Sequence, residues 1–204
     1  MARPRSDDKR SSIVSAAIRV IAAEGVSAST AAIAKEAGVS NGSLFTYFAT
    51  KADLLNHLYV QLKSEAATAS LKDLPPDDDP REQMLCLWSQ RLRWAADAPA
   101  KHKALAHLLV SDEITPESRE QGQRVMADVM RLLDRTHRNG PMHGASMVFV
   151  MSLIAALANV TVDFMIADPS NADRHCRAGF EAIWRVISED ASGERVGDGS
   201  FNKG

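Results

Sequence analysis

Apolar residues recur at helical spacing along almost the whole chain of 204 residues. One face of the first predicted helix carries them at positions i, i+3, i+4, i+7 and i+8. These residues are Ile13, Ala16, Ala17, Val20 and Ile21. Runs that alternate apolar and polar residues between hairpin turns, as strands do, are absent from the sequence. The pattern therefore predicts an all-α fold of about nine helices.

Glycines, prolines and capping residues divide this pattern into elements. Gly25 ends the first helix, because glycine tolerates the left-handed conformation that follows many helices. Thr50 and Asp53 have the spacing of a capping box and begin the fourth helix. The prolines and consecutive aspartates of residues 73–80 break the chain after that helix. The expected helices span residues 7–24, 29–38, 40–48, 50–71, 81–96, 99–111, 116–137, 143–167 and 171–188.

Residues 29–51, STAAIAKEAGVSNGSLFTYFATK, have the organisation of two short helices joined by a tight turn. Gly38 supplies the turn, and Ser40 caps the second helix. That helix is only about two turns long, and Leu44 and Phe48 are its inward-facing anchors. Its polar flank is left free. This arrangement favours a helix-turn-helix, whose second helix enters the major groove of DNA.

The run IAKEAGVSNGSLFTYFATKADLL resembles the signature of the TetR (tetracycline-repressor-like) family in order, spacing and residue type. The resemblance covers about residues 9–58. It implies an N-terminal three-helix DNA-binding domain and a C-terminal helical domain for ligand binding and dimerisation. It also implies a transcriptional regulator, most simply a repressor that binds a palindromic operator as a homodimer. A small molecule would release that repressor from DNA.

The resemblance also implies a division of the chain into domains. We expect residues 1–52 to form the helix-turn-helix DNA-binding domain and residues 53–72 to form a connecting helix. Residues 73–191 would then form the effector-binding and dimerisation domain. The last segment, residues 192–204, is expected to be a disordered tail.

The expected DNA contacts lie at the start of the second helix, on the recognition helix and at the first turn of the fourth helix. Asn41 is the candidate for reading a base edge through its amide. Phe45 stands where the family usually has tyrosine, so it lacks a hydroxyl for a phosphate. Lys51 matches the family lysine that pairs with phosphate. The full set is Ser29, Thr30, Ser40, Asn41, Gly42, Ser43, Phe45, Tyr47 and Lys51.

The charge distribution agrees with a head that contacts nucleic acid. Residues 1–52 hold seven Lys or Arg and four acidic residues, whereas the remaining chain holds 17 basic and 22 acidic residues. A basic end on an acidic body suits contact with phosphates. Arg3, Arg5 and Arg10 are candidates for contacts to the minor groove or the DNA backbone.

Composition favours a cytoplasmic protein with no membrane partner. Cys86 and Cys176 are too few for a disulfide scaffold, and the charged N-terminus shows no secretory signal. Residues 145–162 carry no charge and approach the length of a membrane span. Asn159 interrupts this stretch and Asp163 follows it at once, so we expect a core or interface helix instead.

The last two predicted helices are the expected dimer interface, as the resemblance implies. Ala155 and Ala156 allow close approach on the first of these helices. An apolar stripe on the second consists of Phe180, Ile183, Trp184 and Ile187. Packing of this stripe within its own chain is the alternative.

Methionines, tryptophans and a few polar groups in the body indicate an effector pocket, although each is also an ordinary core residue type. Such walls favour an apolar or aromatic organic molecule. The candidate pocket residues are Trp88, Trp94, His107, Met126, Met130, Phe149, Asn159 and Asp163.

Catalytic and metal-binding patterns are absent from the sequence. Its histidines form no HExxH motif, and neither GxSxG nor a glycine-rich phosphate loop occurs. We therefore expect no enzyme activity, no metal and no cofactor. A helical protein-interaction adaptor without sequence-specific DNA binding remains the alternative to a regulator.

Overall fold

The computed structural model describes residues 4–76, 79–138 and 140–188, and these residues contain helices and no strand. The described chain forms ten α-helices and one 3-10 turn. Their bounds are α1 (Pro4–Glu24), α2 (Thr30–Glu36), α3 (Asn41–Tyr47), α4 (Lys51–Ser70), α5 (Pro80–Asp97), α6 (Pro99–Leu109), α7 (Pro116–Val125), α8 (Ala127–His137), α9 (Met147–Ala167), η1 (Pro169–Asn171) and α10 (Ala172–Ile187). The predicted all-α fold is confirmed. The predicted tail, residues 192–204, lies outside the described residues.

Local sequence signals set several of the helix ends. Gly25, directly after α1, has a φ of 78°, a left-handed conformation that favours glycine. Thr50 and Asp53 form the predicted capping box at the start of α4. The Asp53 amide donates to the Thr50 hydroxyl and the Thr50 amide donates to the Asp53 carboxylate, both at 3.0 Å.

The single helix predicted over residues 116–137 is wrong. Two helices, α7 and α8, occupy this stretch, and Met126 joins them with a φ of −93° and a ψ of 0°. Packing explains the break, since α7 contacts α4 whereas α8 contacts α5. One straight helix would not reach both neighbours, so tertiary contacts override a continuous helical pattern.

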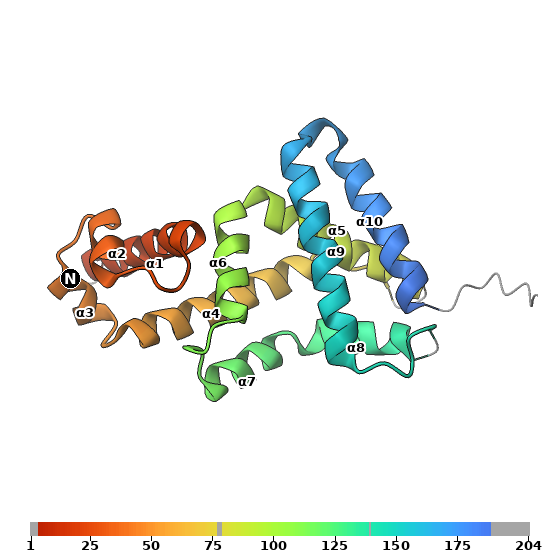
Figure 1. Ribbon diagram of the computed structural model, residues 1–204, viewed down its shortest axis with the longest axis horizontal. Helices are drawn as coiled ribbons and strands as arrows, with labels where there is room; N and C mark the ends of the chain where they lie inside the picture. The colour runs from red at the N-terminus through yellow and green to blue at the C-terminus, as the bar shows by residue number, and fades with distance from the viewer. Residues whose placement is uncertain (1–3, 77–78, 139, 189–204) are drawn as a thin grey trace, which may run out of the picture.

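Figure 1 shows the helices arranged as a small head and a larger body. The head, α1 to α3, lies at one end of the molecule, and α9 and α10 lie side by side in the other half. Helix α4 begins at the head and runs into the body, where it contacts α5, α6 and α7. Helix α6 packs directly against α1.

The apolar core of the head, here called the head core, continues beyond the first three helices. It includes Leu54, Leu55 and Leu58 on the first half of α4, all fully buried. It also includes Ala104 and Leu108 of α6, which are fully buried as well. Two helices of the expected connector and body therefore complete the head core. The expected boundaries at residues 52 and 72 stay predictions.

A second core fills the body, where α5, α9 and α10 meet. The Trp88 indole N–H donates to the Cys176 carbonyl oxygen at 2.9 Å, which fixes α5 against α10. Gly179 lets α10 approach its neighbours. A Cβ atom at Gly179 would lie 2.5 Å from the Thr161 Oγ1 and 3.0 Å from the Trp88 Cζ2.

Helix α9 is the one helix of the described chain that is long and apolar enough to cross a membrane. Its mean hydropathy is 2.0, yet only 22% of the apolar window is buried. Val150, Val162 and Met165 face the body core, and a broad apolar face remains exposed. Within a single chain, α9 is therefore covered on one side only.

Replacing Gly179 by alanine is expected to destabilise the fold. The new methyl group would press on Thr161, whose hydroxyl is held by its bond to the Leu157 carbonyl at 2.7 Å. This strain outweighs the gain in helix propensity, so the free energy of unfolding should fall by about 1 kcal/mol or more. Urea denaturation followed by circular dichroism, at one fixed protein concentration, measures it.

Gly144→Ala is the matched control, because a Cβ atom there meets nothing within 4 Å. We expect that variant to stay within about 0.5 kcal/mol of the unsubstituted protein. Equal stability of the two variants would show that α9 and α10 are not in close contact at Gly179.

Candidate nucleic-acid interface and ligand cavity

Helices α2 and α3 are joined by the tight turn that the sequence predicts. Gly38 has a φ of 67°, and the Val39 amide donates to the Ala34 carbonyl at 3.0 Å. The Ser40 hydroxyl then accepts from the Ser43 amide at 3.1 Å and caps α3. These bonds are local in sequence, and together they help to set the angle between the two helices.

Helix α3 turns most of its side chains outward. Leu44 is fully buried, and Phe48, directly after the helix, is 4% exposed. Asn41, Gly42, Phe45 and Thr46 are exposed, whereas Ser43 and Tyr47 are half-buried. Phe45 keeps 41% of its surface exposed. A polar helix surface that also carries an exposed aromatic ring is suited to contact another molecule.

The other predicted DNA-contact residues border α3. The exposed Ser29 caps α2 by accepting from the Ala32 amide at 3.1 Å, and Thr30 is half-buried. Lys51 is half-buried in the first turn of α4, directly after the capping box. No carboxylate within the described ranges forms an ion pair with Lys51.

Arg10 holds the junction of α3 and α4, a contact that sequence reasoning missed. Its guanidinium lies 5.0 Å from the centre of the Phe48 ring and 3.3 Å from the His57 Nε2. Burial, and then the charge of Arg10, lower the pKa of His57, so its neutral ring can accept a hydrogen bond. The expected role of Arg10 at DNA therefore competes with a contact inside the head. The side chains of Arg3 and Arg5 lie outside the described residues.

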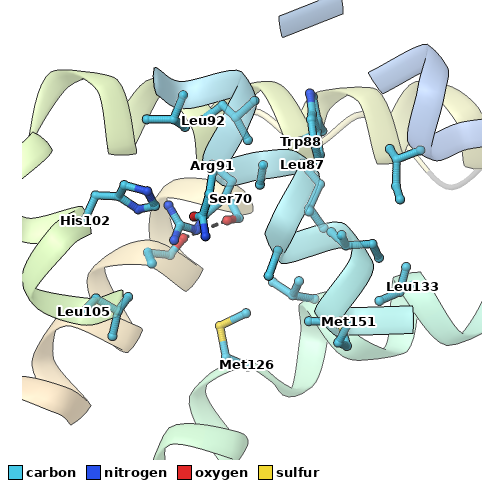
Figure 2. Close-up of a pocket in the computed structure, with 18 of the residues that line it drawn as sticks. Ser70, Leu87, Trp88, Arg91, Leu92, His102, Leu105, Met126, Leu133 and Met151 are labelled. Atoms are coloured by element: carbon cyan, nitrogen blue, oxygen red, sulfur yellow. Dashed lines mark hydrogen bonds between the residues drawn. The ribbon is translucent and has the colours of Figure 1, made fainter. Parts of the chain in front are cut away.

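A cavity of about 260 Å³ lies in the body between α4, α5, α6, α8, α9 and α10. Most of its wall is apolar (Figure 2). Ala106 and Leu109 of α6 and Ala155 and Asn159 of α9 line the cavity and are also exposed, so they mark its mouth. The cavity thus reaches solvent between α6 and α9.

The structure brings three of the eight predicted pocket residues to this cavity, namely Trp88, Met126 and Asn159. His107 instead lies beside Gly25 in the head, within 3.8 Å of where a Cβ atom would stand. Phe149 is 53% exposed on the outer face of α9. Trp94, Met130 and Asp163 are also outside the cavity lining.

Three basic side chains line the cavity, and sequence reasoning missed all of them. They are Lys63, Arg91 and His102. Burial lowers the pKa of each, that of Arg91 to about 10. The sequence does contain a signal for Arg91. This charged residue lies on the same helix face as the apolar repeat of Met84, Trp88, Leu92 and Ala95 on α5.

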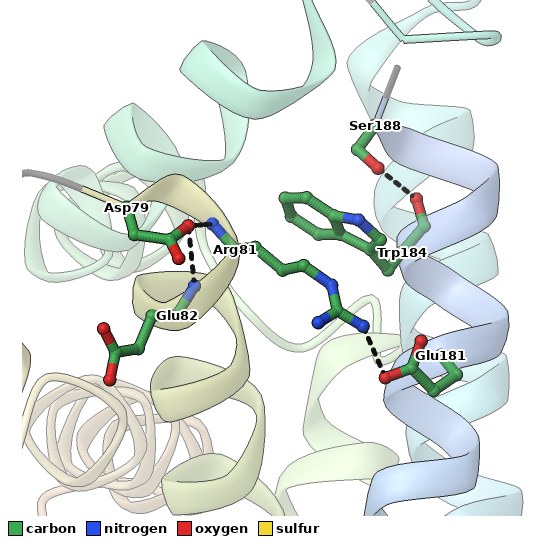
Figure 3. A network of polar contacts seen from close by, with 6 residues as sticks. All are labelled: Asp79, Arg81, Glu82, Glu181, Trp184 and Ser188. Carbon is green, nitrogen blue, oxygen red and sulfur yellow. Dashed lines mark hydrogen bonds and ion pairs between the residues drawn. The ribbon is translucent and has the colours of Figure 1, made fainter. Parts of the chain in front are cut away.

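The predicted dimer stripe on α10 needs a correction. Phe180 and Ile187 are fully buried and Ile183 is 2% exposed, because all three pack into the body core of their own chain. Trp184 is half-buried, and the Arg81 guanidinium lies 5.9 Å from the centre of its ring. Figure 3 shows Arg81 extending from α5 toward α10.

Further contacts hold Arg81 in this position. Its guanidinium forms an ion pair with Glu181 at 2.6 Å, and Asp79 caps the start of α5 through the Arg81 amide at 2.8 Å (Figure 3). The pair is exposed, so it orients the helices more than it stabilises them. Only Ala155 and Ala156 of the predicted interface residues are exposed. In the described part of the chain, no group of three His, Cys, Asp or Glu side chains is placed to hold a metal ion.

The fold and the exposed recognition helix define a helix-turn-helix DNA-binding protein. Residues 13–58 match the family model described as bacterial regulatory proteins, tetR family. This match covers the helix-turn-helix head, and the chain as a whole has the TetR fold, as the sequence resemblance implied.

Solved structures agree over nearly the whole chain. A TetR-family transcription regulator from Marinobacter aquaeolei VT8 matches with a TM-score of 0.71 at 22% identity, over 92% of this chain and 99% of that one. A tetR-family regulatory protein from Rhodococcus RHA1 matches with a TM-score of 0.69 at 20% identity, over 88% and 97%. The regulator FadR from Bacillus subtilis, solved in complex with stearoyl-CoA, matches with a TM-score of 0.60 at 20% identity, over 85% and 96%. At these identities the likeness concerns the fold.

Proposed function

We propose that this chain is a ligand-responsive transcriptional regulator that binds a palindromic operator as a homodimer, represses transcription and leaves DNA when a small molecule binds. The observation that carries this proposal is the outward flank of α3 within a TetR-family domain. Repression follows most simply, because a dimer on a promoter blocks polymerase without further contacts. Such a protein acts in the cytoplasm, where bacterial DNA is.

Three exposed positions of α3 have distinct roles in this proposal. Asn41 reads a base edge through its amide. Gly42 lacks a side chain and so permits close approach of DNA, and the space around it is open, since a Cβ atom there would meet nothing within 4 Å. Phe45 makes an apolar contact with a sugar or a thymine methyl group. Ser29, Thr30, Ser40, Ser43, Tyr47 and Lys51 contact phosphates or position α3.

Lys51→Ala is expected to weaken binding to all DNA sequences alike. A phosphate contact contributes through counterion release, so its loss makes the salt dependence shallower by about one unit in the log–log slope. Fluorescence-anisotropy titrations at several salt concentrations measure that slope. Lys72→Ala, an exposed lysine after the far end of α4, should leave it unchanged. An unchanged slope in Lys51→Ala would remove this lysine from the interface.

Asn41→Ala is expected to reduce discrimination between operator and random DNA. Loss of an amide that reads a base should weaken operator binding by about ten-fold or more and affect random DNA little. Competition titrations with the chain's own upstream DNA and a shuffled duplex test this. Equal losses on both duplexes would exclude base reading by Asn41. No specific, salt-sensitive binding by the unsubstituted protein would favour the helical adaptor instead.

The exposed face of α9 supports the homodimer. Ala155 and Ala156 lie on this face and allow close approach of a second helix. Val160 and Phe164, one turn and two turns further along α9, are each 56% exposed. Ser152, Asn159 and Asp163 are also exposed on α9, but the face is largely apolar, which is unusual on the surface of a monomer. A second copy of α9, related by a two-fold axis, covers it with the same residues.

Val160→Arg is expected to convert the dimer to a monomer, because the interface would bury an unpaired charge. Sedimentation equilibrium should then give half the mass of the unsubstituted protein, and operator affinity should fall. Val110→Arg is the matched control, since Val110 is 83% exposed directly after α6. A dimer that tolerates Val160→Arg would contradict this interface.

The position of the cavity supports control by a ligand. Helices α4 and α6 both line the cavity and complete the head core, and Ala66 and Leu105 belong to both sets of residues. A ligand that binds one arrangement of these helices more tightly shifts the population of dimers toward it. The stearoyl-CoA complex of the Bacillus subtilis regulator supports this, because a protein of the same fold was solved with a bound acyl-CoA.

A further inference from the structure

The charged side chains that line the cavity indicate the chemical class of the effector. This inference rests on the proposed function. Most of the side chains that line the cavity are aliphatic, aromatic or methionine side chains. The charged or titratable groups that line it are Lys63, Arg91 and His102, and within the described residues no acidic side chain lines it. A cavity whose ionisable groups are all basic has a positive potential that favours an anion.

Arg91 is more deeply buried than Lys63, the other strongly basic residue of the three. Its guanidinium lies 4.6 Å from the centre of the Trp94 ring, and no hydrogen bond or ion pair joins it to another described residue. Figure 2 shows its head group on the cavity wall near Ser70 and His102. Burial alone lowers the pKa of Arg91 to about 10, so the guanidinium stays charged at neutral pH. A buried cation without an acidic partner is costly, and a carboxylate would offset that cost.

His102 supplies a second polar group at the same place. Its Nδ1 is buried and has no hydrogen-bond partner among the described residues. Burial, and then the charge of Arg91, lower its pKa, against weaker opposing effects of Asp163 and Asn159. The ring is therefore neutral at pH 7, and in one tautomer its Nδ1–H is a free donor. An unsatisfied buried group of this kind indicates a missing partner.

We propose that the cavity binds an amphipathic monocarboxylate, with its carboxylate on Arg91 and its apolar body in the rest of the cavity. The guanidinium donates two parallel hydrogen bonds to the carboxylate, and His102 donates a third. Trp88, Met126, Leu133 and Met151 surround the hydrocarbon part. The volume of about 260 Å³ lies near the lower limit of small-molecule sites, so it fits one medium-length chain or a two-ring acid.

The same contacts give the ligand a route to the head. Arg91 is on α5 and His102 is on α6. A carboxylate held by both side chains ties these helices together at the cavity. Ala104 and Leu108, on the same helix as His102, are packed in the head core. A shift of α6 on binding therefore moves a wall of the head.

A matched series of straight-chain probes tests the proposal. Decanoate, 1-decanol and decylamine have the same hydrocarbon length and differ in their head group. Calorimetric titration of the full chain should show that decanoate binds about ten-fold tighter than decanol, because a charge-assisted hydrogen bond contributes that much. Decylamine should bind more weakly than both. The proposal would be overturned if decanol bound as tightly as decanoate. It would also be overturned if neither decanoate nor 2-naphthoate, a two-ring acid, bound to the protein.

Substitutions assign the preference to Arg91. Arg91→Met keeps the bulk of the side chain and removes the charge, so the preference for decanoate should disappear while decanol still binds. Arg91→Lys should retain part of the preference for decanoate over decanol. Arg93→Met is the control, since Arg93 is exposed and its ion pair to Asp173 lies outside the cavity. An undiminished preference in Arg91→Met, or an equal loss in Arg93→Met, would contradict this assignment.

The result can be separated from that of the proposed function. Operator binding is measured without any probe, so a regulator that binds DNA yet ignores carboxylates would refute only the effector class. Carboxylate binding without any specific DNA complex would refute the regulator and leave the ligand site in place.

Discussion

The structure depends on an apolar core that the DNA-binding head does not complete by itself. Ala104 and Leu108 of α6 lie in the same fully buried cluster as Ile13 and Ile33 of the head. Because apolar cores tolerate neither gaps nor overlap, the orientation of the head is tied to α6 and to the first half of α4. The direction in which α3 presents its outer flank is therefore decided partly by the body.

The cavity is lined by the same two helices, and Ala66 and Leu105 belong to both the cavity lining and the head core. Lys63, Ala66 and Ser70 of α4 line it, as do His102 and Leu105 of α6. No long chain of contacts is needed between ligand and head, since α4 and α6 belong to both. A ligand nevertheless has an effect on the head only if it binds one of the arrangements that the head core allows more tightly than the others. The basic side chains that line the cavity of the free protein have little opposing charge, so an arrangement that brings them close together binds an anion more tightly.

Local signals made the head predictable, whereas packing decided the body. The turn at Gly38, the cap at Ser40 and the capping box at Thr50 involve neighbours in sequence, and each was predicted and found. The stripe of Phe180, Ile183 and Ile187 was also recognised, but an apolar stripe does not say which chain covers it. It packs inside its own chain, and the outer face of α9 remains open. That Arg91 and His102 line the same cavity was unpredictable, because they lie on two different helices.

The central claim is that two copies of α3 read duplex DNA from one dimer. Methylation protection of the chain's own upstream DNA tests it most directly, because it reports on guanine N7 atoms in the major groove. The account predicts two protected segments related by a dyad, with centres about one helical turn, or a whole number of turns, apart on the same face. Absence of protection at low salt, or protection of segments on opposite faces of the duplex, would contradict it.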